Sequence, residues 1–219
     1  RPFLVSGTLL GYARNGALLS HDKDVDVGVF GWEAQFDIAA CLMRNRRFRV
    51  STRNLLGQRA YCVPVIHNAS GITIDIFFYQ PDGDKLVTGV NHDFGYIQEF
   101  EFSRFDLQKI DFLETSFYAP DDIDKNLAEN FGDWRIPDRN YISHLESPST
   151  RKVGGDVYMI VARTSLLSAL IAKNLEKAAR AFKIAVRHAH SPLQLGADLL
   201  QQMDESCGFS TLQQVAVEA

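Results

Sequence analysis

Residues 3–29, FLVSGTLLGYARNGALLSHDKDVDVGV, decide the fold of this chain. The apolar run from Pro2 to Ser6 is typical of a short buried strand, and apolar residues at helical spacing predict a short helix from Thr8 to about Asn15. Gly16 is expected to end that helix, because glycine readily adopts the left-handed conformation found there. Polar and apolar residues then alternate from Asp24 to Val29, which indicates a second strand. The stretch therefore predicts a strand, a helix and a strand in succession.

The turn at Gly7-Thr8 joins the first predicted strand to the helix. Backbone N–H groups at a helix N-terminus favour phosphate, and a glycine lets the backbone approach a ligand closely. Gly7 and Thr8 are therefore candidate phosphate-binding residues. On its own the signal is weak, because such turns are common in proteins that mix strands and helices.

Asp24 and Asp26 lie two residues apart on the second predicted strand, so their side chains share a face, with Cα atoms about 6 to 7 Å apart. Two carboxylates that close repel each other unless a cation lies between them or one of them is protonated. Carboxylate oxygens are ligands that suit Mg²⁺ or Mn²⁺. Asp22 extends the alternating series. Taken alone, the pair is explained equally well by a solvated strand edge.

Asp75 is a single acid in the strongly apolar segment Ile72–Phe78, which we expect to be a strand. An aspartate is almost never fully buried without a partner. The partner could be a nearby backbone N–H or an arginine, or Asp75 could be a third metal ligand supplied by a neighbouring strand. The glycine turn, the Asp-x-Asp pair and the later acid together match the nucleotidyltransferase pattern of the polymerase-β-like fold. That pattern predicts metal-dependent phosphoryl transfer, in which a carboxylate can also orient or deprotonate the attacking hydroxyl.

The remaining elements predict an α/β fold, with a mixed sheet flanked by helices and a helical C-terminal part. We expect a nucleotidyltransferase-like catalytic domain over residues 1–150 and a helical segment over residues 151–219 that packs on it. The expected strands cover 48–52, 60–67 and 72–79, with a turn at 81–84 and a small antiparallel ribbon formed by 100–105 and 111–118. The expected helices cover 33–45, 121–131, 157–188 and 192–203.

Composition and charge exclude several other classes of protein. The net charge of −4 gives no basic excess for binding duplex nucleic acid. Cys41, Cys62 and Cys207 are far apart and lie in no zinc-ligand spacing, so we expect neither a disulfide framework nor structural zinc, and a reduced cytoplasmic setting is the default. No apolar run reaches the length of a transmembrane span. We expect the chain to be a piece of a longer, multidomain protein, whose other parts could associate with a membrane.

Two sequence motifs resemble a known family. Residues 7–14, GTLLGYAR, and 20–28, SHDKDVDVG, resemble the opening motif of the LicD/fukutin family, Gly-Thr/Ser-Leu-Leu-Gly-x-x-Arg followed by Pro-Trp-Asp-x-Asp-h-Asp-h-Gly, where h is apolar. Residues 117–120, FYAP, and 131–134, FGDW, resemble a later family segment. The similarity covers residues 4 to 140. It departs from the family at His21, where tryptophan is usual, and at Lys23, where an acid or an aromatic residue is common.

The resemblance implies a reaction and a set of site residues. Family members transfer a phosphorylated alcohol, such as phosphocholine or ribitol phosphate, from a CDP-linked donor to a glycan hydroxyl. It implies that Asp24, Asp26 and Asp75 form the catalytic triad and hold Mg²⁺ or Mn²⁺. It also implies that the turn at Gly7 and Thr8, together with Arg14, binds the donor phosphate. Asp22 could lie in the outer shell of the metal site, or it could be a solvated loop residue.

Other readings stay open at this point. Arg14 could be a surface cation at a helix end. The reaction could be addition of NMP from an NTP to a small molecule or a protein. The domain could also be a non-catalytic scaffold that binds a nucleotide or a glycan. Glycerol phosphate is a further possible cargo, and synthesis of a bacterial capsule or another cell-surface glycan is the setting that the resemblance favours.

Overall fold

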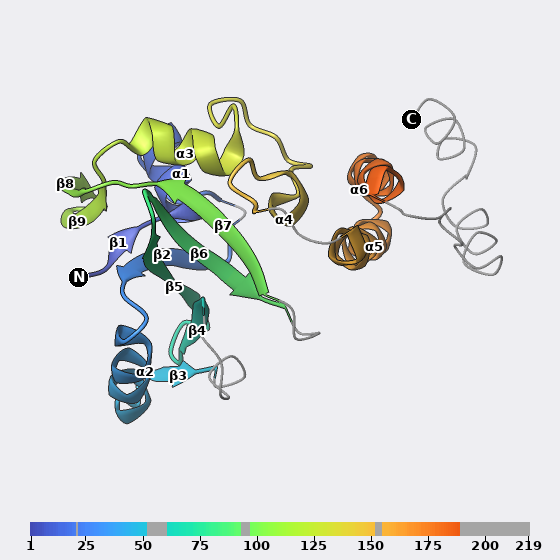
Figure 1. The fold of residues 1–219 in the computed structure, drawn as a ribbon. Helices are drawn as coiled ribbons and strands as arrows, with labels where there is room; N and C mark the ends of the chain where they lie inside the picture. Colours follow the sequence, from blue (N-terminus) through green and yellow to red (C-terminus); the bar gives the residue numbers. More distant parts are fainter. Residues whose placement is uncertain (21, 52–60, 93–96, 152–154, 189–219) are drawn as a thin grey trace. The chain divides into compact units, whose positions relative to one another are not determined.

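The computed structural model of the protein describes residues 1–20, 22–51, 61–92, 97–151 and 155–188 (Figure 1). The chain divides into two compact units. The first comprises Arg1–Ile136 and Pro148–Arg151, and the second comprises Pro137–Ser147 and the chain from Lys152 onwards. The predicted helix over 192–203 lies outside the described residues, as do His21 and Cys207. Packing of the helical segment on the catalytic domain stays a prediction.

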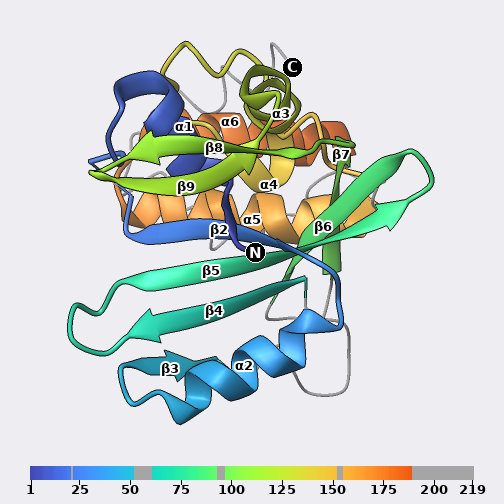
Figure 2. The ribbon, with the colours of Figure 1, turned by 90° about the vertical axis from the view of Figure 1, so that its left-hand side faces the viewer.

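The described strands of the first unit form a seven-stranded mixed sheet and a separate two-stranded ribbon (Figure 2). The sheet has the order β1-β2-β5-β4-β3, with β6 added to β5 and β7 added to β6. Its strands are β1 (Phe3–Leu4), β2 (Asp24–Phe30), β3 (Phe48–Val50), β4 (Cys62–His67), β5 (Thr73–Asp82), β6 (Lys85–Asn91) and β7 (Ile97–Ser103). The ribbon pairs β8 (Leu107–Phe112) with β9 (Thr115–Pro120).

One strand pair in the sheet is parallel, and it positions the candidate site. Strands β2 and β5 run in parallel over seven registered pairs, from Asp24↔Thr73 to Phe30↔Tyr79, and Asp26 lies beside Asp75. The helix α1 (Ser6–Asn15) connects β1 to β2 and ends at Gly16, which adopts the left-handed conformation with φ 61°. The predicted strand-helix-strand succession is thus confirmed, and glycine ends the helix for the reason expected.

Helices cover both faces of the sheet. The helix α2 (Ala34–Arg44) buries Ala39 in an apolar cluster with Val29 of β2 and Phe78 of β5. The opposite face of β2 carries Asp26, which α1 contacts through a hydrogen bond. On that side α1 packs with the ribbon and with α3 (Ile123–Phe131), whose Leu127 is fully buried. The acidic face of β2 therefore lies under α1, away from α2.

The antiparallel pairing after β5 differs from the prediction. The turn expected at 81–84 is present but shorter, since β5 continues through Asp82 and a hairpin loop at Gly83 and Asp84 leads into β6 at Lys85. β6 itself was not predicted, and β7 pairs with it rather than forming the small ribbon, which consists of β8 and β9. The sequence pattern did not reveal β6 because Gly89 lies within it, and a glycine inside a run of strand-forming residues argues against a strand. In the structure a Cβ at Gly89 would collide with the carbonyl of Gln98 on β7, so the close pairing of these strands requires it.

The second unit is helical. It contains the short α4 (Ser143–Glu146), α5 (Gly155–Ile171) and α6 (Leu175–His188). The prediction of a single helix over 157–188 is wrong, because the helical conformation is interrupted at Lys173, which has a positive φ of 55°. Asn174 then begins the next helix, and its side chain accepts a hydrogen bond from the N–H of Lys177 at 3.0 Å. The Ala/Leu-rich composition on both sides concealed this break, although asparagine is a preferred residue at helix N-caps.

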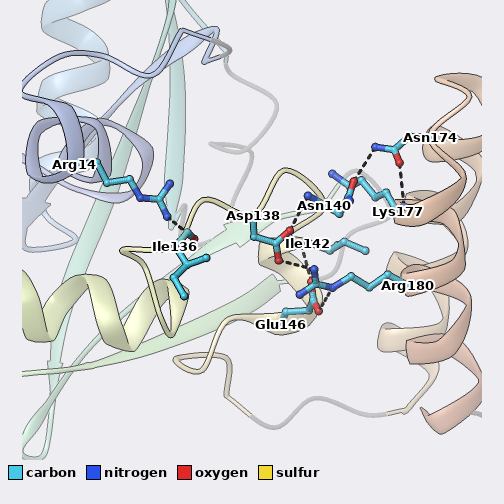
Figure 3. Close-up of polar contacts among 9 residues, drawn as sticks. All are labelled: Arg14, Ile136, Asp138, Asn140, Ile142, Glu146, Asn174, Lys177 and Arg180. Atoms are coloured by element: carbon cyan, nitrogen blue, oxygen red, sulfur yellow. Dashed lines mark hydrogen bonds and ion pairs between the residues drawn. The ribbon is translucent and has the colours of Figure 1, made fainter.

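Polar contacts tie α6 to the segment that contains α4 (Figure 3). Arg180 binds the carboxylates of Asp138 and Glu146, and Asn174 donates a hydrogen bond to Asn140 at 2.9 Å. Small residues allow α5 and α6 to approach closely, since Ala162, Ala178 and Ala181 are completely buried between them. None of the described helices is long and apolar enough to cross a membrane.

Candidate metal centre

Three aspartates meet at the centre of the sheet. Asp24 and Asp26 project from the same face of β2, and Asp75 projects from β5 as the registered neighbour of Asp26. One carboxylate oxygen from each residue lies within 4.8 Å of the other two. The parallel register of two adjacent strands therefore brings together three acids that are separated by up to 51 positions in the sequence.

Asp26 is held in place by the turn at the start of α1. The backbone N–H of Gly7 donates a hydrogen bond to Asp26 Oδ2 at 2.8 Å. The backbone N–H of Asp26 donates in turn to the hydroxyl oxygen of Thr8 at 2.8 Å. Thr8 and Asp26 are both buried, so the bond between them is shielded from water, while the bond from Gly7 is partly buried.

Burial and mutual repulsion make the charged forms of two of the acids unfavourable. The pKa of Asp26 is raised to about 8, chiefly by burial and then by the charge of Asp24, while the hydrogen bond from Gly7 opposes the rise. The pKa of Asp75 is raised to about 6, again by burial first and by Asp24 second. A nearby cation would reverse both effects by compensating the negative charge.

The residues fit a divalent metal ion. Asp75 Oδ1 is buried and receives no hydrogen bond from any described residue. A buried acceptor without a partner costs free energy, which a bound cation would remove. All the assembled ligand atoms are carboxylate oxygens, the type that Mg²⁺ and Mn²⁺ prefer. The three aspartates could therefore hold a metal ion.

Asp22 and Lys23 lie immediately before β2. A Cβ added to Gly7 would lie 2.5 Å from Asp22 Oδ2 and 3.1 Å from Asp26 Oδ2, so both carboxylates approach the bare backbone of this glycine. Asp22 also contributes to the raised pKa of Asp26. Lys23 is exposed. Asp22 thus lies near the triad, and its assignment to the outer shell stays a prediction.

Arg14 makes its contacts with backbone carbonyls. Its Nε donates to the carbonyl oxygen of Trp134, and its Nη2 donates to that of Ile136 at 3.3 Å. Two of the five guanidinium donors are therefore engaged by the segment after α3. Trp134 is buried in the apolar cluster beneath α1 and α3. The predicted contact between Arg14 and a donor phosphate stays a prediction, but the structure gives this residue a second role.

Two neighbouring features were not anticipated from the sequence. Ser6, which precedes the turn glycine, has a positive φ of 45°, a conformation rarely adopted by serine. Cys62 of β4 is buried close enough to the acids for Asp75 and Asp26 to raise the pKa of its thiol, after the larger effect of burial. In the structure Cys62 is paired with Phe77, which lies two residues from Asp75 and on the same face of β5. The alternation of side chains along β4 and β5 is the sequence signal that could have placed Cys62 near the acids.

The mixed sheet, the glycine in the first turn of α1 and the acids on two adjacent parallel strands define a nucleotidyltransferase-like fold. Comparison with protein families agrees, because residues 1–122 match the model described as LicD/FKTN/FKRP, nucleotidyltransferase domain. The chain belongs to this family. The resemblance drawn from residues 7–14 and 20–28 is thereby confirmed, together with the predicted fold class.

Individual relatives are more distant. The chain is 24% identical over 157 residues to ribitol-5-phosphate transferase FKTN of Mus musculus, and 23% identical over 157 residues to the protein of that name from Homo sapiens. Each match covers 70% of this chain and 33% of the relative. The chain thus spans about a third of the length of these curated relatives.

Proposed function

We propose that the protein is a metal-dependent phosphotransferase that moves a phosphorylated alcohol from a CDP-linked donor to a glycan hydroxyl. The observation that carries the proposal is the convergence of Asp24, Asp26 and Asp75 within 4.8 Å of one another. Membership of the LicD/FKTN/FKRP family and similarity to proteins named ribitol-5-phosphate transferase support the reaction class. Ribitol phosphate, phosphocholine and glycerol phosphate are the candidate cargoes.

In this mechanism the acceptor hydroxyl attacks the phosphorus that carries the alcohol. A bond forms between the acceptor oxygen and phosphorus, the bond to the bridging oxygen breaks, and CMP leaves. Mg²⁺ or Mn²⁺, held by Asp24, Asp26 and Asp75, would neutralise charge on the phosphate oxygens.

The protein's own groups orient the acids and receive the proton. Gly7 and Thr8 hold Asp26 on the acidic face of β2. Asp75 presents a carboxylate oxygen with no partner among the described residues, and a carboxylate has two oxygens, so that one could hold the cation while the other accepts the hydroxyl proton and passes it to solvent. We propose Asp75 as the group that orients the attacking hydroxyl.

The products of the reaction test the proposal. Purified protein is incubated with Mg²⁺, a glycan acceptor and CDP-ribitol, CDP-choline or CDP-glycerol in parallel, and nucleotides are separated by chromatography. Release of CMP that requires both acceptor and cation supports the proposal and identifies the cargo. Incubation with each NTP serves as the comparison, because release of pyrophosphate would indicate NMP transfer instead. Nucleotide binding without any turnover would indicate a non-catalytic scaffold.

A matched pair of variants links turnover to the site. Asp24→Asn removes one charge from the triad at nearly constant volume and is expected to abolish CMP release. Asp37→Asn makes the same chemical change on the exposed side of α2 and is expected to leave it unchanged. Equal activity of these two variants would contradict the proposed role of the triad.

A further inference from the structure

We infer that Thr8, together with Gly7, positions Asp26 as the pre-oriented ligand of the metal centre. The inference rests on the proposed function and assigns the turn a task other than the predicted contact with phosphate. Thr8 touches neither metal nor substrate in this role. It acts through Asp26, and it is therefore a positioning residue.

Asp26 is anchored at three atoms. Its backbone N–H is bonded to the hydroxyl of Thr8, its carbonyl oxygen accepts a bond from the N–H of Val5 at 3.4 Å, and its Oδ2 accepts one from the N–H of Gly7. The first two contacts fix the backbone of β2 against the start of α1. The third fixes the orientation of the carboxylate, because one of its two oxygens is held by the backbone N–H of Gly7.

Asp75 is not held in this way. Its Oδ1 receives no hydrogen bond from the part of the chain that the structure describes. A cation would therefore meet the carboxylate of Asp26 already in place, while that of Asp75 adjusts to it. Groups that orient a metal ligand typically affect metal affinity by about 10- to 100-fold when they are changed.

The Thr8 hydroxyl is suited to this task by its burial. Thr8 has a relative exposure of 2%, and its oxygen accepts the bond from the Asp26 backbone. A valine has nearly the same shape but cannot accept a hydrogen bond, so it would leave the buried N–H of Asp26 without a partner. A serine keeps the acceptor. The pair Thr8→Val and Thr8→Ser therefore separates the hydrogen bond from the packing.

The chain offers a matched control for the same substitution. Thr88 of β6 is also buried, with 3% exposure, and its hydroxyl has no hydrogen-bond partner among the described residues. Thr88→Val thus replaces a buried threonine by valine without removing a contact to the acids. It controls for any general effect of the substitution on folding.

The experiment measures the dissociation constant of Mn²⁺ by electron paramagnetic resonance for the full 219-residue chain and its variants. We expect Thr8→Val to weaken Mn²⁺ binding by about 10- to 100-fold, with Thr8→Ser and Thr88→Val close to the unaltered protein. Excess Mn²⁺ should then restore turnover of Thr8→Val. Circular dichroism verifies that each variant is folded.

A second variant tests the inference if Thr8→Val does not fold. Gly7→Ala leaves the Thr8 hydroxyl and the backbone N–H of residue 7 in place but introduces a Cβ at 2.5 Å from Asp22 Oδ2 and 3.1 Å from Asp26 Oδ2. It should displace the Asp26 carboxylate and weaken Mn²⁺ binding as well. Unchanged Mn²⁺ affinity in a folded Thr8→Val or Gly7→Ala would overturn the positioning role while leaving the proposed function intact. Absence of Mn²⁺ binding and of turnover in the unaltered protein would instead remove the proposed function, and the inference with it.

Discussion

Asp26 on β2 and Asp75 on β5 are Cα partners in a parallel strand pair, with their carboxylates on the same face of the sheet. Asp24 adds a third carboxylate two residues before Asp26 on the same face of β2. This arrangement concentrates negative charge in a partly buried place, where it is unfavourable without a cation. The consequences of that charge can be measured in several ways.

The stability of the metal-free protein should fall as pH rises. The pKa values of Asp26 and Asp75 are raised from 3.8 to about 8 and about 6, so the folded protein retains protons that the unfolded chain releases. The stabilisation is complete below pH 4 and is lost as pH rises towards 8, with a slope of up to about 1.4 kcal/mol per pH unit for each group.

Urea unfolding at pH 5 and pH 7.5 in EDTA checks this prediction. Asp26→Asn removes the larger of the two contributions, so the variant should lose less free energy of unfolding between these pH values than the unaltered protein does. A free energy that changes with pH equally in both proteins would show that Asp26 titrates normally. Saturating Mg²⁺ should stabilise the unaltered protein most at the higher pH.

Gly28→Ala should destabilise the first unit by about 1 to 3 kcal/mol. A Cβ at Gly28 would collide with the ring of Phe3, which is 1% exposed and cannot move aside. That ring packs on Phe30 and Tyr79 with centroid distances of 4.8 and 5.5 Å. Thermal unfolding measures the loss. Adding Phe3→Leu should recover part of it, and strictly additive effects of the two changes would contradict the collision.

Arg14→Met should lower the melting temperature. It removes the hydrogen bonds to the carbonyl oxygens of Trp134 and Ile136, and it thus loosens the segment after α3 from α1. Hydrogen bonds from a charged donor contribute about 1.5 to 3 kcal/mol each. A variant with unaltered thermal stability but weaker binding of a CDP-linked donor would favour the phosphate contact as the main role of Arg14.

Arg180→Met should loosen the second unit locally. Arg180 bridges Asp138 and Glu146, and Glu146 is the more buried of the two with 18% side-chain exposure. The network is partly solvated, so we expect a loss of about 1 kcal/mol. Amide hydrogen exchange should become faster in α4 and in the first turns of α6. Unchanged exchange there would show that apolar packing alone holds these helices together.

The sequence was informative where local pattern and chemistry coincide. Alternation with a period of two placed Asp24 and Asp26 on one face of a strand, and an acid within an apolar run singled out Asp75. Their meeting in space depends on the parallel pairing of β2 with β5, which the structure shows and the sequence pattern did not specify beyond a neighbouring strand. The identity of the bound ion and the roles of these acids stay predictions.

Other features depend on contacts that no local pattern encodes. Gly89 serves a close approach between β6 and β7, although a glycine in that position argues against a strand. The helix break at Lys173 follows no glycine or proline. Thr8 lies where a phosphate-binding residue is expected, and its bond to the Asp26 backbone becomes visible when α1 is placed over β2. In each case tertiary packing decides between local alternatives of similar free energy.

A calorimetric titration of Mn²⁺ into the metal-free protein tests the central claim most directly. The account predicts a binding site that is lost in Asp24→Asn and in Asp75→Asn and retained in Asp37→Asn, with all four proteins folded. Binding of Mn²⁺ with unaltered affinity when either Asp24 or Asp75 is changed would contradict the assignment of the metal centre to these acids.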